Sequence, residues 1–146
     1  MDYILFDIDK TEYGISLKSV REVIKISKID PLLGTPNFIE GIISLRGHNI
    51  AVIDLRKKLG MTVSDNIKKG FVIAGKVNQF IMGFIVSKIN GIVPIRMGQI
   101  DSTSQIIHSV HQVSFVQGIT RINNKPILII HLDQVFEPTE LAYFNE

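Results

Sequence analysis

Residues 34–60 read GTPNFIEGIISLRGHNIAVIDLRKKLG and carry the strongest structural signal in the chain. Two apolar runs, Ile42–Leu45 and Ile50–Ile53, predict neighbouring strands because β-branched residues favour an extended backbone. Arg46-Gly47-His48-Asn49 forms the connection between them, and its Gly47 and Asn49 tolerate positive φ. Arg46 is therefore expected at the corner of a rigid hairpin, a position that suits docking better than catalysis.

The same stretch carries its own start and stop signals. Gly34 and Pro36 interrupt the chain before the first strand. After the second strand, Asp54 stands where a helix N-cap is expected, and Gly60 ends a short helical segment. The pattern is that of a strand pair followed by about one capped helical turn.

Composition narrows the class of protein. The chain has 146 residues, 45% of them hydrophobic and 21% charged, which argues for one folded domain over residues 1–146. A net charge of +2 with dispersed basic residues argues against nucleic-acid binding. The absence of cysteine excludes disulfides and thiolate metal sites. No signal peptide or long apolar run is present, so we expect a cytoplasmic protein without membrane insertion.

Most of the remaining pattern is also β. Alternating or continuous apolar runs predict strands over residues 3–8, 13–17, 71–74, 80–86, 89–95, 115–122 and 127–130. One segment differs, because Val20, Val23 and Ile24 are spaced as on a helix and Ser19 with Glu22 resembles a capping box. We therefore predict a short helix there, a four-residue corner at 123–126, a last helical turn over 131–136 and a polar tail.

The chain also matches itself. Gly14 and its neighbours match Gly83 at a spacing of 69 residues, and Gly41 and its neighbours match Gly118 at a spacing of 77 residues. The change of spacing places about eight extra residues within 98–112 of the second half. The arginine corner does not recur, because Asn123-Asn124 occupies the corresponding position.

Two matching sets of roughly five short strands predict two small β-barrels with a groove between them, since short twisted strands close to avoid exposed edges. The halves are expected at residues 1–69 and 70–146, each forming one barrel. A partner would lie in the groove.

Catalytic and metal-binding alternatives have weaker support. His108 and His111 could share a helix face as metal ligands, and Ser109 or Ser114 could act beside them in a small hydrolase. No carboxylate or thiol stands at ligand spacing, however, and no GxSxG elbow or phosphate-binding loop is present. We expect no cofactor, no metal and no enzymatic activity. The residues alone indicate an interaction module, in which Arg46 could equally be a solvated hairpin charge.

Two segments resemble a known family. The stretches YGISLKSVREVIKI (residues 13–26) and NFIEGIISLRGHNIAVIDLRKKLG (residues 37–60) resemble the signature of CheW-like coupling proteins of bacterial chemotaxis, and looser similarity continues to about residue 136. The resemblance implies two five-stranded SH3-like β-barrels and no enzymatic activity. It implies two partners, the regulatory domain of the histidine kinase CheA and the cytoplasmic tip of chemoreceptors.

The same resemblance implies where the partners bind. The valine and glutamate of the family's V-x-E segment correspond to Val20 and Glu22, and the arginine of its LRG corner corresponds to Arg46. With Val23, these residues are the expected receptor- and kinase-binding set. Two glycines, Gly41 and Gly47, are expected to shape the turns instead. The corner continues with His48-Asn49, where the family usually has a small, apolar or basic residue.

Overall fold

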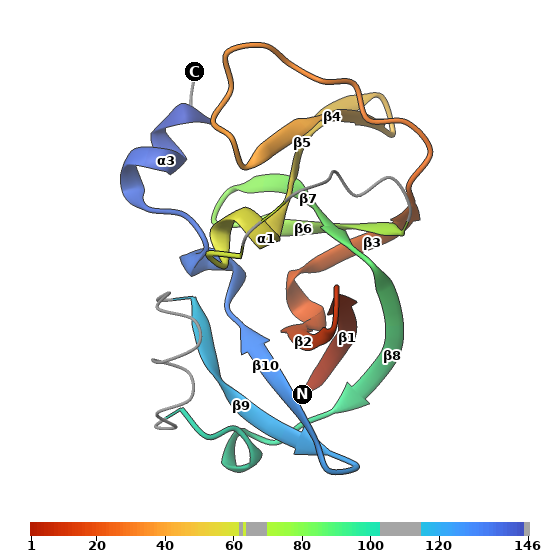
Figure 1. The fold of residues 1–146 in the computed structure, drawn as a ribbon, viewed down its shortest axis with the longest axis vertical. Coiled ribbons are helices and arrows are strands. Elements are labelled where there is room, and N and C mark those ends of the chain that lie inside the picture. Colours follow the sequence, from red (N-terminus) through yellow and green to blue (C-terminus); the bar gives the residue numbers. More distant parts are fainter. Residues whose placement is uncertain (62, 64–69, 103–114, 145–146) are drawn as a thin grey trace.

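The strands pair into two five-stranded sheets (Figure 1). The computed structural model describes residues 1–61, 63, 70–102 and 115–144. Sheet A has the order β8-β1-β2-β10-β9, and sheet B has the order β3-β6-β7-β5-β4. The strands of sheet A are β1 (Asp2–Ile8), β2 (Thr11–Ser16), β8 (Lys88–Pro94), β9 (Val116–Ile122) and β10 (Lys125–Ile130). Those of sheet B are β3 (Val20–Lys25), β4 (Ile39–Leu45), β5 (His48–Ile53), β6 (Phe71–Val77) and β7 (Phe80–Val86). The prediction of a mainly β fold with two five-stranded units is confirmed.

The helices in the described residues are short. The α-helices are α1 (Leu55–Lys58) and α3 (Pro138–Tyr143), and the 3₁₀ turns are η1 (Leu17–Ser19), η2 (Met97–Gln99) and η3 (Leu132–Gln134). Asp54 caps α1 as predicted, since its side chain accepts a hydrogen bond from the Arg56 amide.

The internal duplication is visible in the register of the strands. Val52 of β5 pairs in parallel with Gly83 of β7, and Ile129 of β10 pairs in parallel with Gly14 of β2. These are the equivalent positions in the sequence repeat. The two sheets also have the same order once each of β1–β5 is replaced by its counterpart among β6–β10.

The two repeats exchange strands. Sheet A combines β1 and β2 of the first half with β8, β9 and β10 of the second, and sheet B combines β6 and β7 with β3, β4 and β5. The prediction that residues 1–69 and 70–146 each form their own barrel is therefore wrong. The sequence repeat does not reveal this exchange, because either pairing satisfies the same strand pattern.

Each sheet closes on itself through an isolated bridge. The chain leaving β3 bends so that Asp30 pairs with Ile42 of β4, and the chain after β8 brings Asp101 to Ile119 of β9. Gly41 permits the first closure, because a Cβ there would lie 2.2 Å from the Asp30 carbonyl oxygen. Gly41 is therefore a close-approach residue within β4, whereas the sequence placed it at a turn.

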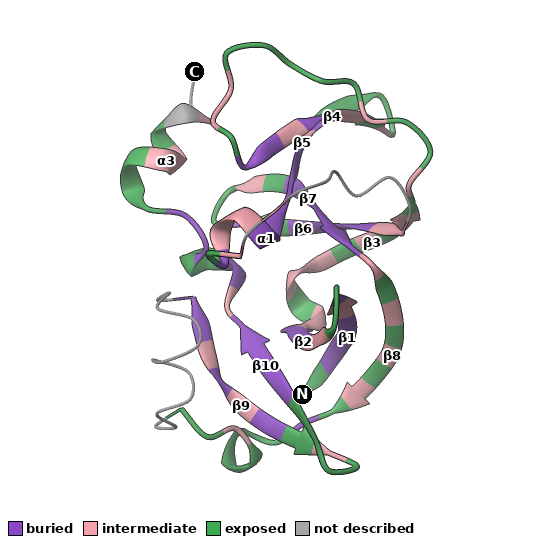
Figure 2. Ribbon diagram, viewed as in Figure 1, coloured by how far each residue is buried: buried purple, intermediate pink, exposed green. Residues whose placement is uncertain are grey.

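Buried and less buried residues alternate along several strands (Figure 2), and the buried hydrophobic residues in the described part of the chain form three clusters. Tyr3 and Leu5 belong to a small cluster of sheet A, and Val52 and Val72 belong to a small cluster of sheet B. The largest cluster draws on both sheets, including Phe6 of β1 and buried residues of β6 and β7. The seam between the sheets is thus the main core of the molecule.

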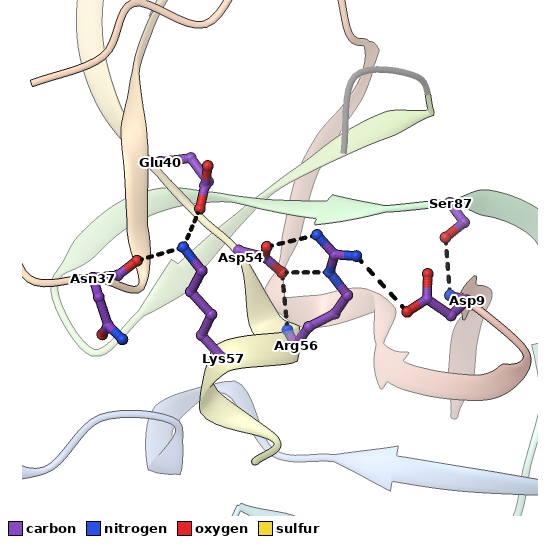
Figure 3. Close-up of polar contacts among 7 residues, drawn as sticks. All are labelled: Asp9, Asn37, Glu40, Asp54, Arg56, Lys57 and Ser87. Carbon is purple, nitrogen blue, oxygen red and sulfur yellow. Dashed lines mark hydrogen bonds and ion pairs between the residues drawn. The ribbon is translucent and has the colours of Figure 1, made fainter. Parts of the chain in front are cut away.

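A buried ion pair adds a polar link between the sheets (Figure 3). The Arg56 guanidinium donates to Asp54 through Nε at 3.1 Å and through Nη2 at 3.0 Å. Its Nη1 lies 3.8 Å from Oδ2 of Asp9, in the β1–β2 turn of sheet A. The Asp9 amide in turn donates to Ser87 Oγ, at the β7–β8 junction.

The C-terminal segment is more ordered than the sequence indicated. Helix α3 has Pro138 in its first turn and a Glu137–Glu140 capping box, and Glu140 accepts from Lys58 of α1 at 2.6 Å. The Phe144 ring lies 5.9 Å from that of Phe80. The predicted polar tail is therefore a helix that packs against the domain. Its polar residues, which gave no helical pattern in the sequence, form the helix cap and the ion pair with Lys58.

The helix predicted from Ser19 is absent, since residues 20–25 form strand β3. Burial explains the error. Half-buried and exposed residues alternate along this strand, so the apolar residues on both of its faces produced an apparent helical spacing.

Candidate docking site

The β4–β5 hairpin presents Arg46 at its tip. Leu45 pairs with His48, so only Arg46 and Gly47 lie in the turn. Their φ values are 52° and 81°, as a two-residue type I′ turn requires. The predicted four-residue connection is therefore too long, and Asn49 belongs to β5. The same error applies to 123–126, where Ile122 pairs with Lys125 across Asn123-Asn124.

Arg46 is paired with a residue of strand β3. Its Nε donates to Glu22 Oε1 at 2.9 Å, while the Arg46 side chain is 79% exposed and that of Glu22 is 31% exposed. Two predicted site residues, 24 positions apart in the sequence, are thus in contact. Residues 20–25 form a strand, so the Glu22 side chain is not used as a helix cap and can pair with Arg46.

A pocket of about 640 Å³ opens beside this ion pair. Its apolar lining comes from Leu45, Ile50 and Ile81, and its remaining lining residues are Arg21, Glu22, Arg46, His48 and Asn49. These residues belong to β3, β7 and the β4–β5 hairpin, all in sheet B. The pocket beside Arg46 therefore lies on one barrel, outside the seam in which the sequence analysis placed the groove.

The two valines of the predicted set lie in different environments. Val20 is half-buried and packs against the main core cluster, whereas Val23 is 38% exposed. Neither lines the pocket beside Arg46. Their role in partner binding stays a prediction, and Val23 has the accessibility that such a role requires.

Most residues of the pocket carry no local signal in the sequence. Arg21 could have been found from its exposed alternate position on β3, had that segment been read as a strand. Ile81 had no local signal, since the parallel pairing of β5 with β7 brings it to the site. His48 and Asn49 were noted only as parts of the corner.

The site offers few groups for catalysis or metal binding. Within the described part of the chain, no three histidine, aspartate or glutamate side chains gather to hold a metal ion. The alternative based on His108, His111, Ser109 and Ser114 lies outside the described residues. Among described residues, what the pocket presents is an apolar surface with charged groups beside it.

The family assignment rests on nearly the whole chain. A family model described as the CheW-like domain matches residues 2–140. The chain belongs to the CheW-like domain family. The resemblance to CheW-like proteins found in the sequence is confirmed, and the family is one of non-enzymatic scaffold proteins.

Individual CheW relatives agree with this assignment. The chain is 28% identical over 139 residues to a probable chemotaxis protein CheW of Rhizobium etli, covering 95% of this chain and 89% of the relative. It is 28% identical over 134 residues to the chemotaxis protein CheW of Bacillus subtilis, covering 92% and 85%. The crystal structure of the scaffolding protein TtCheW from Thermoanaerobacter tengcongensis matches with a TM-score of 0.83 and 32% identity, over 95% of this chain and 94% of that one. This protein is a CheW-like chemotaxis scaffold protein.

No helix among the described residues is both long enough and apolar enough to cross a membrane.

Proposed function

We propose that this scaffold protein couples chemoreceptors to the histidine kinase CheA and that the pocket beside Arg46 is a partner-binding site. Membership of the CheW-like family supports the coupling role. The observation that carries the site assignment is the exposed Arg46–Glu22 ion pair beside an apolar pocket, on a hairpin whose tight turn fixes its geometry.

The geometry suggests how a receptor would bind. An apolar side chain of a receptor helix enters the pocket and covers Leu45, Ile50 and Ile81. Arg46 and Glu22 then fix the register of the helix through charge-assisted hydrogen bonds. An exposed ion pair suits this task, because both partners keep donor and acceptor capacity toward the solvent.

The kinase would use a different face. In this proposal the regulatory domain of CheA meets an edge of one barrel, while the receptor occupies the hairpin site. Single contacts of this kind are typically micromolar, about −8 kcal/mol, and multiple contacts in an array supply the remaining affinity. The array would recruit this cytoplasmic scaffold to membrane-bound receptors.

The test is co-sedimentation with receptor fragments and CheA. Arg46→Glu should abolish binding to the receptor and leave binding to CheA intact, because it places a carboxylate beside Glu22 and removes the cation offered to the receptor. Since the side chain is 79% exposed, stability should change by less than about 1 kcal/mol. Unfolding of the variant would show that Arg46 is structural.

A charge swap separates the two roles of Arg46. The double variant Glu22→Arg and Arg46→Glu can re-form the intramolecular ion pair with reversed polarity. If the pair only holds the hairpin, the double variant should bind as the wild type does. If Arg46 contacts the partner, binding stays lost although the fold is intact.

A further inference from the structure

The outward face of strand β3 carries a row of three exposed residues, Arg21, Val23 and Lys25, which we name the β3 strip. The alternate residues Val20, Glu22 and Ile24 are half-buried. Among the described residues, the side chains of Arg21 and Lys25 make no ion pair or hydrogen bond. Two cations without a carboxylate partner therefore flank an exposed valine.

The duplication shows that the fold does not require this charge. In sheet A the counterpart of β3 is β8, where the equivalent positions hold Asn90, Ile92 and Pro94. These three positions are exposed as well, and Ile92 is 56% exposed. The equivalent exposed positions are thus uncharged in one repeat and cationic in the other.

The β3 strip is suited to contact through side chains rather than through strand pairing. β3 is the first strand in the order of sheet B, which closes only through the single Asp30–Ile42 bridge beyond its end, and the pairing of β3 with β6 is interrupted by a bulge between Val20 and Glu22. Bulges and edge lysines such as Lys25 are devices that discourage the addition of another strand. A partner would therefore lie across the side chains, beginning at Arg21, which also lines the pocket beside Arg46.

We propose that the β3 strip binds an acidic helix of the chemoreceptor. An apolar residue of that helix would contact Val23, and one carboxylate would pair with each of Arg21 and Lys25. This inference rests on the proposed function and specifies the chemistry of the partner at that site. Four residues of strand span about 13 Å. On a helix, residues seven or eight positions apart span about 11–12 Å, with a residue of the same face midway. The long cationic side chains cover the difference.

The test uses the full chain and the purified cytoplasmic fragment of a chemoreceptor from the same organism. Binding is measured by calorimetry for the wild type, for Arg21→Glu/Lys25→Glu and for the milder Arg21→Gln/Lys25→Gln. The matched control is Lys88→Glu/Lys125→Glu, which makes the same change of charge at exposed positions of sheet A. Thermal unfolding of every variant verifies that it is folded.

We expect the charge reversal to weaken binding at least tenfold and the control by less than twofold. Raising the salt from about 0.1 M to 1 M should weaken wild-type binding severalfold, but should hardly affect the Gln variant, because screening removes only charge contacts. If the receptor binds the wild type and both strip variants equally, the inference is wrong while the proposed function stands. If the wild type does not bind the receptor at all, the proposed function itself fails.

Discussion

At the scale of single residues, the Asp54–Arg56 pair is the most consequential polar contact. The Asp54 side chain caps α1 and also holds the guanidinium of Arg56, and the two residues are 0% and 4% exposed. Asp54→Ala should destabilise the protein by about 3–5 kcal/mol, because it leaves a cation buried without its main partner and removes a cap. Urea unfolding measures this loss.

Asp9 provides the control for that measurement. It approaches the same guanidinium at 3.8 Å, but its side chain is 46% exposed. Asp9→Ala should therefore cost less than about 1 kcal/mol. Equal effects of the two substitutions would mean that Asp9 holds Arg56 as firmly as Asp54 does.

The buried phenol of Tyr13 should make the folded protein less stable at high pH. Burial raises the pKa of Tyr13 to about 12, from its ordinary value of 10.0. The folded state therefore retains the phenol proton at a pH where the unfolded chain loses it. The contribution of the Tyr13 phenol to the free energy of unfolding is fully present below pH 10.0. It falls by roughly 2 kcal/mol as the pH rises toward about 12.

The measurement is urea unfolding of the wild type and Tyr13→Phe at several pH values from 9 to 12. The wild type should lose stability faster than the variant across this interval. Parallel curves would show that the phenol does not titrate differently in the two states.

At the scale of elements, two glycines should differ sharply when replaced by alanine. Gly47 has φ of 81° and no neighbour within 4 Å of an added Cβ, so Gly47→Ala should cost only the strain of a left-handed residue, about 1–2 kcal/mol. Gly41→Ala should cost more, because its Cβ would collide with the Asp30 backbone and open the closure of sheet B. Comparing their urea midpoints tests this order, and a larger loss at Gly47 would contradict it.

The sequence predicted most strands but not how they meet. Continuous apolar runs such as Ile50–Ile53 identify strands locally, so the hairpins and the duplication could be found. β3 was misread because apolar residues occur on both of its faces, Val23 on the exposed face and Val20 and Ile24 on the half-buried face, which hides the period of two. Because of that error the pocket could not be predicted. Glu22 reaches Arg46 only when residues 20–25 form a strand, and Ile81 reaches the pocket only through the nonlocal pairing of β5 with β7.

At the scale of the whole molecule, the exchange of strands makes the two halves mutually dependent. Residues 1–69 contain β1 and β2 of sheet A and the outer three strands of sheet B, so neither sheet is complete in one half. The main core also takes buried side chains from both sheets. The repeat is therefore a unit of sequence and not a unit of folding.

This arrangement predicts the behaviour of the separated halves. Fragments 1–69 and 70–146, each produced alone, should lack the cooperative unfolding and dispersed amide spectrum of the full chain, because each would expose unpaired strand edges and half of the shared core. Mixed at equal concentration, they should form a one-to-one complex with a native-like spectrum. The complex should also bind the receptor fragment, since Arg46, Glu22 and β7 would meet again. A folded, monomeric fragment 1–69 would contradict the strand exchange, and the mixture provides the control for damage caused by cutting the chain.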